Sequence, residues 1–127
     1  MTHIDQVLIL CPLAITGGPE AIHQLAGTLR HNGVNASIMY YGGPNRGRVV
    51  VKGGVIQGTH SSQAQTPECY LHYGAQVAST CELKASLCIV IPEVLQQNFQ
   101  SLKPAQVALW WLSVDNALEV GRPMREP

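Results

Sequence analysis

The chain has 127 residues, of which 46% are hydrophobic and only 13% are charged, and its formal net charge is +0. This length suits one domain with a hydrophobic core, and the balanced charge excludes broad electrostatic capture of nucleic acid or of an acidic membrane surface. The high apolar content predicts strands that are buried on both faces, as in a parallel sheet covered by helices.

The first unit of the chain reads as a strand, a glycine turn and a helix. Residues 4–11 end in a continuous apolar run, which predicts a buried central strand. Thr16, Gly17 and Gly18 lie in the loop that follows, and the apolar positions of residues 19–32 recur at helical spacing. Strand, turn and helix in this order form the first half of a βαβ unit.

The next two segments predict a second strand and a glycine-rich insertion. Residues 34–41 alternate in a way that is typical of a strand. Residues 42–66 contain two β-prone runs on either side of Gly53 and Gly54, which indicates a hairpin, but the composition also fits a mobile loop. This segment carries a local excess of positive charge from Arg46, Arg48 and Lys52. The excess indicates either a solvent-exposed face or a contact for an anionic ligand.

The second half of the chain predicts further strands alternating with helices. Glycine and proline residues mark most of the boundaries between these segments. In chain order, the elements are a short helix over 67–74, a third strand over 76–79, a buried strand over 86–91, a helix over 93–102, a buried strand over 107–112 and a helix beginning at 117–120.

This order of elements predicts an α/β fold for residues 1–127 as a single domain. The expected architecture is a Rossmann-like, doubly wound, mostly parallel sheet of about five strands, in the order 3-2-1-4-5, with helices on both faces. Ligands of such sheets bind beyond the carboxyl ends of the strands, where the winding direction reverses. The loops at 12–18, 92–93 and 113–116 converge there, so we expect the glycine loop and the Ser-Val-Asp-Asn turn to be neighbours.

The candidate ligand-binding residues lie in these loops. Gly17 and Gly18 either cradle a phosphate, because free amides at a helix start favour an anion, or only make a tight turn. Glu20 disfavours a phosphate by its charge, and it either caps the helix start or accepts sugar hydroxyls. The dinucleotide fingerprint G-x-G-x-x-G and the phosphate-loop lysine motif are absent from the sequence. The full predicted set is Thr16, Gly17, Gly18, Glu20, Glu93, Ser113, Asp115 and Asn116.

Two tryptophans precede the last members of this set. A carboxylate and an amide, as at Asp115 and Asn116, bind hydroxyls in a planar fashion, and an aromatic face can stack on a pyranose ring. Alternatively, Asp115 only caps a helix. Because successive strand residues point to opposite faces of a sheet, we expect at least one of Trp110 and Trp111 to pack in the core.

The histidines and cysteines predict no metal centre and no cofactor. Cys69 and His72, with His60 or Cys81, come nearest to a zinc set, but a second C-x-x-C or H-x₃-H half is missing. No G-x-S-x-G elbow is present, and Glu93 has no evident second carboxylate for hydrolysis, so no catalytic residue is assigned.

The cysteines are scattered along the sequence, which indicates reduced thiols of a cytoplasmic protein and not a disulfide framework. They are Cys11, Cys69, Cys81 and Cys88.

The stretch TGGPEAIHQLAGTLRHNGVNASIMYY resembles the opening of the amino-terminal domain of retaining glycosyltransferases with the two-domain glycosyltransferase-B fold. In that family, a Gly-Gly loop after the first strand leads into a helix of the form LAxxLxxxGxxV. The segments PECYLHYG, IVIPE and LWWLSVDN are similar to a bacterial subset associated with surface polysaccharide synthesis. The resemblance covers residues 8–41 and 67–117, and its first motif is matched by Gly17-Gly18, Leu25-Ala26, Leu29 and Gly33-Val34, with Val34-Asn35 replacing the usual His.

The resemblance implies an acceptor-side domain that binds a sugar, a sugar phosphate or a nucleotide-sugar, with the glycine loop near the phosphates of the donor. It also implies a second domain that grips the nucleotide. We expect this chain to lack that domain and to transfer no sugar alone, as a truncated piece, a remnant or a subunit that needs a partner.

The alternative hypothesis is a non-enzymatic α/β binding or assembly module that forms a homodimer, since the low charge does little to oppose self-association. Neither hypothesis includes a nucleic-acid partner. The sequence has no basic leader and no apolar run near ~18 residues, so we expect no membrane segment.

Overall fold

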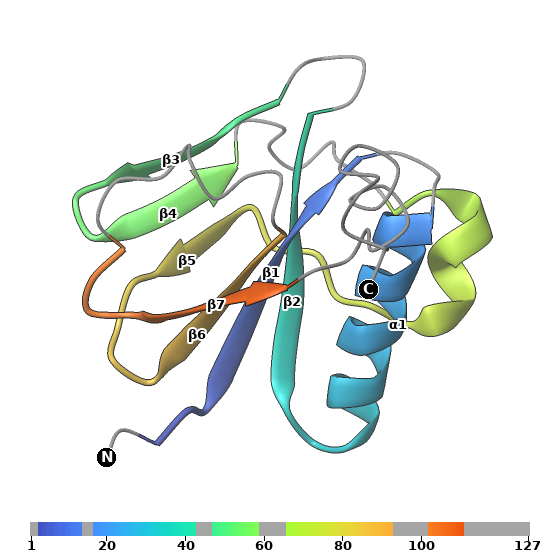
Figure 1. Ribbon diagram of the computed structural model, residues 1–127, viewed down its shortest axis with the longest axis horizontal. Coiled ribbons are helices and arrows are strands. Elements are labelled where there is room, and N and C mark those ends of the chain that lie inside the picture. Colours follow the sequence, from blue (N-terminus) through green and yellow to red (C-terminus); the bar gives the residue numbers. More distant parts are fainter. Residues whose placement is uncertain (1–2, 14–16, 43–46, 59–65, 93–101, 111–127) are drawn as a thin grey trace, which may run out of the picture.

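The computed structural model describes residues 3–13, 17–42, 47–58, 66–92 and 102–110. At its centre lies a four-stranded parallel sheet in the order β2-β1-β6-β7 (Figure 1). The central strand β1 is buried from Leu8 to Cys11, as its continuous apolar run predicts. The four strands are β1 (Gln6–Pro12), β2 (Asn35–Tyr41), β6 (Leu87–Pro92) and β7 (Gln106–Trp110).

The predicted third strand is present only as a single bridge beside β2. Ile38 pairs with Val77 in parallel, donating to the Gln76 carbonyl at 2.7 Å and accepting from the Ala78 amide at 2.8 Å. The prediction of five strands is therefore wrong for the described residues, although the position of this segment beside β2 agrees with the predicted order. Gln76 and Val77 are exposed, so no buried face holds a longer strand in place.

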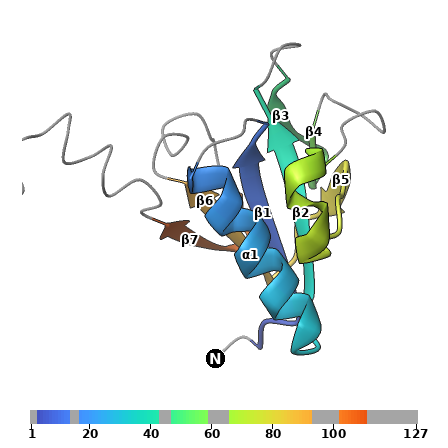
Figure 2. The same ribbon diagram turned by 90° about the vertical axis from the view of Figure 1, so that its right-hand side faces the viewer.

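Both described helices lie on one face of the parallel sheet. Figure 2 shows α1 (Gly17–His31) and the 3₁₀ helix η2 (Glu68–Tyr73) side by side in front of the strands. The short helix predicted over 67–74 is confirmed, and Gly74 ends it in the left-handed conformation with φ 72°. The helix-side core, which joins α1 to the sheet, consists of Ile9, Cys11, Ile22, Ala26, Ile38 and Tyr40.

Among the described residues, the opposite face is covered by a second, antiparallel sheet and not by a helix. This sheet has the order β3-β4-β5, formed by Val49–Lys52, Val55–Gly58 and Thr80–Glu82 (Figure 1). The prediction of helices on both faces is thus wrong for the described residues, and the predicted helix over 93–102 falls almost wholly outside them. The second-face core consists of Leu8, Leu10, Met39, Ile56, Cys81, Leu83, Leu87, Ile89, Ile91 and Leu102.

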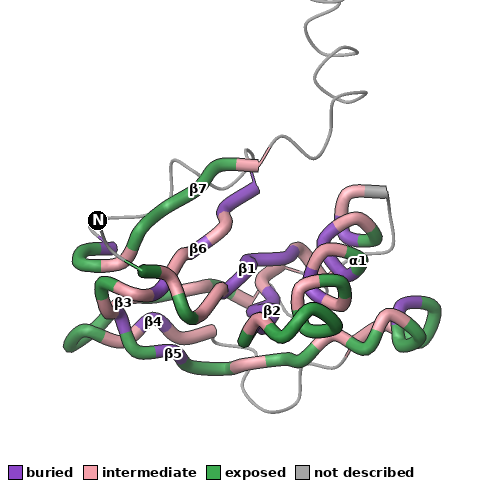
Figure 3. The backbone as a smooth tube through the Cα atoms, turned by 90° about the horizontal axis from the view of Figure 1, so that it is seen from below, coloured by how far each residue is buried: buried purple, intermediate pink, exposed green. Residues whose placement is uncertain are grey.

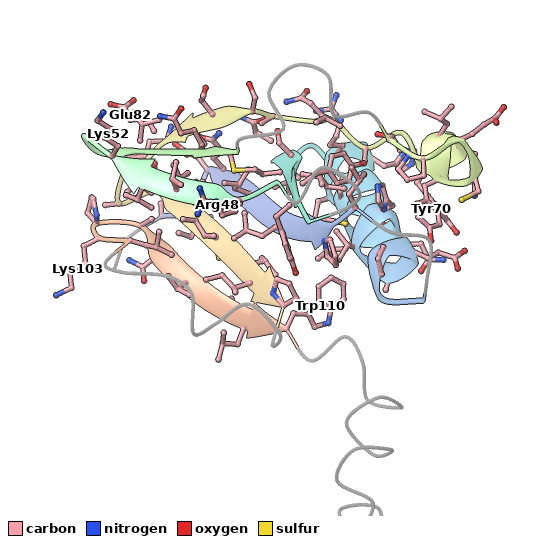
Figure 4. All side chains as sticks on the ribbon, turned by 90° about the horizontal axis from the view of Figure 1, so that it is seen from above. Arg48, Lys52, Tyr70, Glu82, Lys103 and Trp110 are labelled. Carbon is pink, nitrogen blue, oxygen red and sulfur yellow. The ribbon has the colours of Figure 1, made fainter. Side chains whose placement is uncertain are left out.

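The glycine-rich segment adopts the hairpin alternative. Lys52 pairs with Val55, so the turn has two residues, Gly53 and Gly54, with φ values of 62° and 78°. A two-residue type I′ turn requires positive φ at both positions, which glycine adopts without steric cost. Lys52 lies at the far end of the hairpin from α1 (Figure 4), so its charge is remote from the start of that helix.

The strand predicted over 107–112 is present as β7, at an edge of the parallel sheet. Trp110 is half-buried and packs against the helix-side core, as expected for at least one of the two tryptophans. Val107 and Leu109 lie beside Ile89 and Ile91 of β6, but they are 49% and 53% exposed. Figure 3 shows most of β7 in the colour of exposed residues. The second sheet therefore leaves the apolar face of β7 uncovered.

Candidate functional site

The predicted glycine pair lies at the carboxyl edge of the parallel sheet, inside a helix. The helix was predicted to begin at Pro19, whereas α1 already begins at Gly17. The N–H groups of Gly17 and Gly18, in its first turn, have no acceptor within the helix, and Pro19 has no N–H at all. These two amides, with the positive end of the helix dipole, can receive an anion.

Most of the other predicted ligand residues fall outside the described part of the chain. These are Thr16, Glu93, Ser113, Asp115 and Asn116. The strands that lead to their loops are described, and they run parallel in one sheet. The carboxyl ends of β1, β6 and β7 consequently share one edge, which is the condition for the predicted meeting of these loops.

Glu20, which was predicted to cap the helix or to contact a sugar, has a partner within the protein. Its carboxylate accepts a hydrogen bond of 2.7 Å from the Tyr73 hydroxyl, and Gln24 donates to the same hydroxyl oxygen at 3.1 Å. The hydrogen bond to Glu20 is the main cause of the raised pKa of Tyr73. Glu20 therefore ties α1 to η2 across 53 residues of sequence.

A group of hydrogen-bonded polar side chains next to this helix start was not predicted from the sequence. Tyr40, a member of the helix-side core, is 2% exposed, and His23, which contacts it, is 0% exposed. His23 Nδ1 lies 2.6 Å from the Pro19 carbonyl oxygen, and its Nε2 lies 2.7 Å from the Tyr40 hydroxyl. The Tyr40 hydroxyl in turn lies 3.1 Å from Thr66 Oγ1, and Thr66 is half-buried. We call these three side chains the His23–Tyr40–Thr66 chain.

One sequence signal could have revealed this chain. His23 falls next to Ile22, within the apolar stripe of the helix, where a polar side chain is unusual. The other two side chains, Tyr40 and Thr66, could not be named from the sequence, because they lie 17 and 43 residues beyond His23. Tyr70 of η2, which is labelled in Figure 4, also packs against His23, with 4.6 Å between the two ring centroids.

Burial determines the protonation of these groups. It lowers the pKa of His23 from the ordinary 6.5, against a smaller opposing effect of the hydrogen bond to Pro19. It raises the pKa of Tyr40 to about 12, and it also raises the pKa of the neighbouring Cys11 thiol. His23, Tyr40 and Cys11 are therefore all neutral near pH 7.

The lowered pKa of His23 makes the stability of the fold sensitive to acid. Between pH 6.5 and the lower pKa of the folded state, the unfolded chain binds more protons than the folded chain. We expect the free energy of unfolding to be fully maintained above pH 6.5 and to decrease as the pH falls through this window. Urea unfolding between about pH 8 and about pH 5 measures this slope.

Two variants test whether the dependence of the unfolding free energy on pH comes from His23. His23→Gln is expected to lose part of it, whereas Thr28→Gln, at an exposed position of the same helix, should keep the wild-type slope. An unchanged slope in His23→Gln would contradict the assignment.

A groove of about 450 Å³ separates the exposed sides of α1 and η2. The two helices approach closely at Gly27, where an alanine Cβ would overlap the carbonyl oxygen of Tyr73. The groove does not include the predicted ligand residues that the structure describes. It is lined by Gln24, Gly27, Thr28, His31, His72 and Tyr73.

The described ranges contain no group of three or more His, Cys, Asp or Glu side chains that could hold a metal ion. Among the zinc ligands considered from the sequence, Cys69 and His72 lie on η2, whereas Cys81 is buried in β5 on the other face of the parallel sheet. Among the helices of the described ranges, none is long and apolar enough to cross a membrane.

Comparisons with protein-family models, curated proteins and solved structures find no match for this chain.

Proposed function

We propose that this chain is a ligand-binding α/β domain resembling the amino-terminal domain of glycosyltransferases with the glycosyltransferase-B fold. In this proposal it binds a sugar phosphate or a nucleotide-sugar at the carboxyl edge of the parallel sheet. The observation that carries the proposal is the position of Gly17 and Gly18, whose N–H groups have no acceptor within α1 and which begin the helix that follows the central strand.

The topology of the sheet supports this location. The chain passes from β1 to β2 on one side and later to β6 on the other side of β1. Counting the Val77 bridge as a reduced third strand, the strand order is compatible with the order 3-2-1-4-5 that a doubly wound sheet would have. The winding direction then reverses between β1 and β6, where open α/β sheets bind their ligands. Glu93 follows β6 directly in the sequence and remains a proposed sugar contact.

The electrostatics of the helix start are compatible with an anionic ligand. The only carboxylate in the first turn, Glu20, is held by Tyr73 of η2. Amides from Gly17 and Gly18 would receive the phosphate, and Ser113, Asp115 and Asn116 would contact hydroxyls of the sugar. The proposal assigns binding to these residues, and it assigns catalysis to none of them.

A nitrogen-15 NMR titration of the chain tests this proposal. We expect glucose 1-phosphate and UDP-glucose at millimolar concentration to shift the amide signals of Gly17 and Gly18 in a saturable manner. The signals of Gly53 and Gly54, in the remote hairpin turn, serve as the internal control. The absence of saturable shifts at Gly17 and Gly18 with either compound would refute the proposal.

A charge reversal at the helix start sharpens the test. Gly18→Asp places a carboxylate where it suits the helix dipole but repels a phosphate, so we expect a stable protein with at least about tenfold weaker binding of glucose 1-phosphate. Gly53→Asp introduces the same charge in the hairpin turn and should bind like the wild type. Equal affinity of the two variants would argue against the helix start as the phosphate site.

The exposed face of β7 favours a second candidate function, that of an assembly module. Val107 and Leu109 form an apolar pair on an edge strand, a feature that pairs readily with another chain. A homodimer through this strand is expected to become monomeric in a Val107→Lys, Leu109→Lys variant, as measured by sedimentation equilibrium. Unchanged mass of the variant, or a monomeric wild type, would exclude this dimer.

A further inference from the structure

The His23–Tyr40–Thr66 chain is an unusual feature of the helix-side core. The other members of this core are aliphatic side chains and one thiol. Burying an imidazole and a phenol there costs desolvation free energy unless their polar atoms are hydrogen-bonded. Leucine and phenylalanine would fill similar volumes with no such requirement. The chain of hydrogen bonds begins at the first turn of α1 and ends at the half-buried hydroxyl of Thr66.

The direction of each hydrogen bond follows from counting protons. The Pro19 carbonyl can only accept, so His23 Nδ1 carries the proton that it shares with this oxygen. His23 is neutral, and its Nε2 is therefore an acceptor. Tyr40 has a single hydroxyl proton, and it donates this proton to Nε2 over 2.7 Å.

Thr66 is the remaining hydrogen-bond donor among the three side chains. Because the Tyr40 proton is committed to His23, the 3.1 Å contact requires Thr66 Oγ1–H to donate to the Tyr40 oxygen. The Thr66 oxygen then has lone pairs but no free proton. Toward a ligand it can only accept a hydrogen bond. It therefore matches a hydroxyl group and not a phosphate oxygen, which is itself an acceptor.

Hydrogen bonds link this acceptor to the start of α1, where the proposed ligand site lies. Tyr40 lies opposite Cys11 at the carboxyl ends of β2 and β1, and His23 lies one helical turn from Pro19. Three consecutive hydrogen bonds thus connect Thr66 to the helix start that carries Gly18. Resting on the function proposed above, we infer that Thr66 Oγ1 contacts the ligand and accepts a hydrogen bond from a sugar hydroxyl, with His23 and Tyr40 as positioning residues.

The groups that surround His23 do not change these donor and acceptor roles. Tyr40 approaches it from β2 and Tyr70 from η2, and burial keeps the Cys11 thiol of β1 protonated beside Tyr40. On α1 itself, the nearest acidic side chain in sequence, Glu20, is exposed and bonded to Tyr73.

The ligand-independent test is the tautomer of His23. Nitrogen-15 NMR of the imidazole at about pH 7.5 is expected to show a neutral ring with the proton on Nδ1. A proton on Nε2 would overturn the inference whether or not the protein binds a sugar, because Tyr40 would then be free to donate to Thr66.

The binding test compares two probes and two variants. We expect Thr66→Val to weaken glucose 1-phosphate binding by about tenfold and to leave the binding of inorganic phosphate unchanged. Thr66→Ser keeps the hydroxyl and should stay within about twofold of the wild type. Equal loss for both probes, or no loss for glucose 1-phosphate, would overturn the role of Thr66 while leaving the phosphate site at Gly17 and Gly18 intact. A wild-type chain that binds neither probe would overturn the proposed function and the inference with it.

Discussion

Replacing Gly27 with alanine is expected to lower the free energy of unfolding by roughly 1–3 kcal/mol. This is opposite to the usual result in a helix interior, where alanine is favoured over glycine by about 1 kcal/mol. The physical reason is the contact between the two helices, since the new Cβ would overlap the carbonyl oxygen of Tyr73 and lie 3.1 Å from its carbonyl carbon. Backbone atoms cannot rotate away as a side chain can, so η2 must shift from α1.

Urea unfolding followed by circular dichroism measures this loss, with Thr28→Ala as the matched control. Thr28 is the next residue of the helix and is exposed, so its replacement should change stability by less than about 0.5 kcal/mol. A Gly27→Ala variant more stable than the wild type would mean that α1 and η2 do not touch in solution.

Truncating Ile56 to alanine is expected to cost about 2–5 kcal/mol, the range for large-to-small changes in a well-packed core. Ile56 lies in β4 and is 0% exposed, within the second-face core beneath the parallel sheet. If residues 42–66 were a mobile loop, the same substitution would have almost no effect. Thermal or urea unfolding therefore distinguishes the two alternatives that the sequence left open.

The control for this measurement is Val50→Ala in the neighbouring strand β3. Val50 is 39% exposed, and its truncation should cost less than about 1 kcal/mol. Should Ile56→Ala fail to fold, Ile56→Val removes a single methyl group and should cost about 0.5–1.5 kcal/mol. Equal, negligible costs at positions 50 and 56 would contradict the packing of the antiparallel sheet on the second face.

Several elements of the fold could be predicted because their signals are local. The apolar run before Pro12 predicts the buried strand β1, and the glycine pair at 53 and 54 indicates the turn of the β3–β4 hairpin, one of the two alternatives left open for this segment. The parallel arrangement of β1 and β2 follows from the helix between them, since parallel strands need a long crossover. In each case the relevant residues lie within about one element of each other.

The covering of the second face could not be predicted in the same way. The hairpin strands have only four residues each, and β5 has three, which gives too short a pattern to show which surface they cover. The sequence pattern therefore favours helices on both faces. The observed cover is stabilised by Ile56, Cys81 and Leu83, which reach the same core from separate parts of the sequence.

In the candidate site, too, local features could be predicted from the sequence, whereas long-range contacts could not. Gly17 and Gly18 were found from their position after a strand, but the partner of Glu20 lies 53 residues away, and Thr66 lies 26 residues beyond Tyr40. Contacts of this kind leave no periodic trace in the sequence, because each involves one side chain on each element.

By itself, the sequence determined that the chain is α/β, that a buried strand leads through two glycines into a helix, and that the next strand runs parallel to the first. These features follow from periodicity and turn chemistry over a few neighbouring residues. Only the tertiary structure decided that an antiparallel sheet covers the second face, that Tyr73 holds Glu20, and that His23 is buried against Tyr40. These depend on which distant surfaces exclude water together, a property of the whole packed chain.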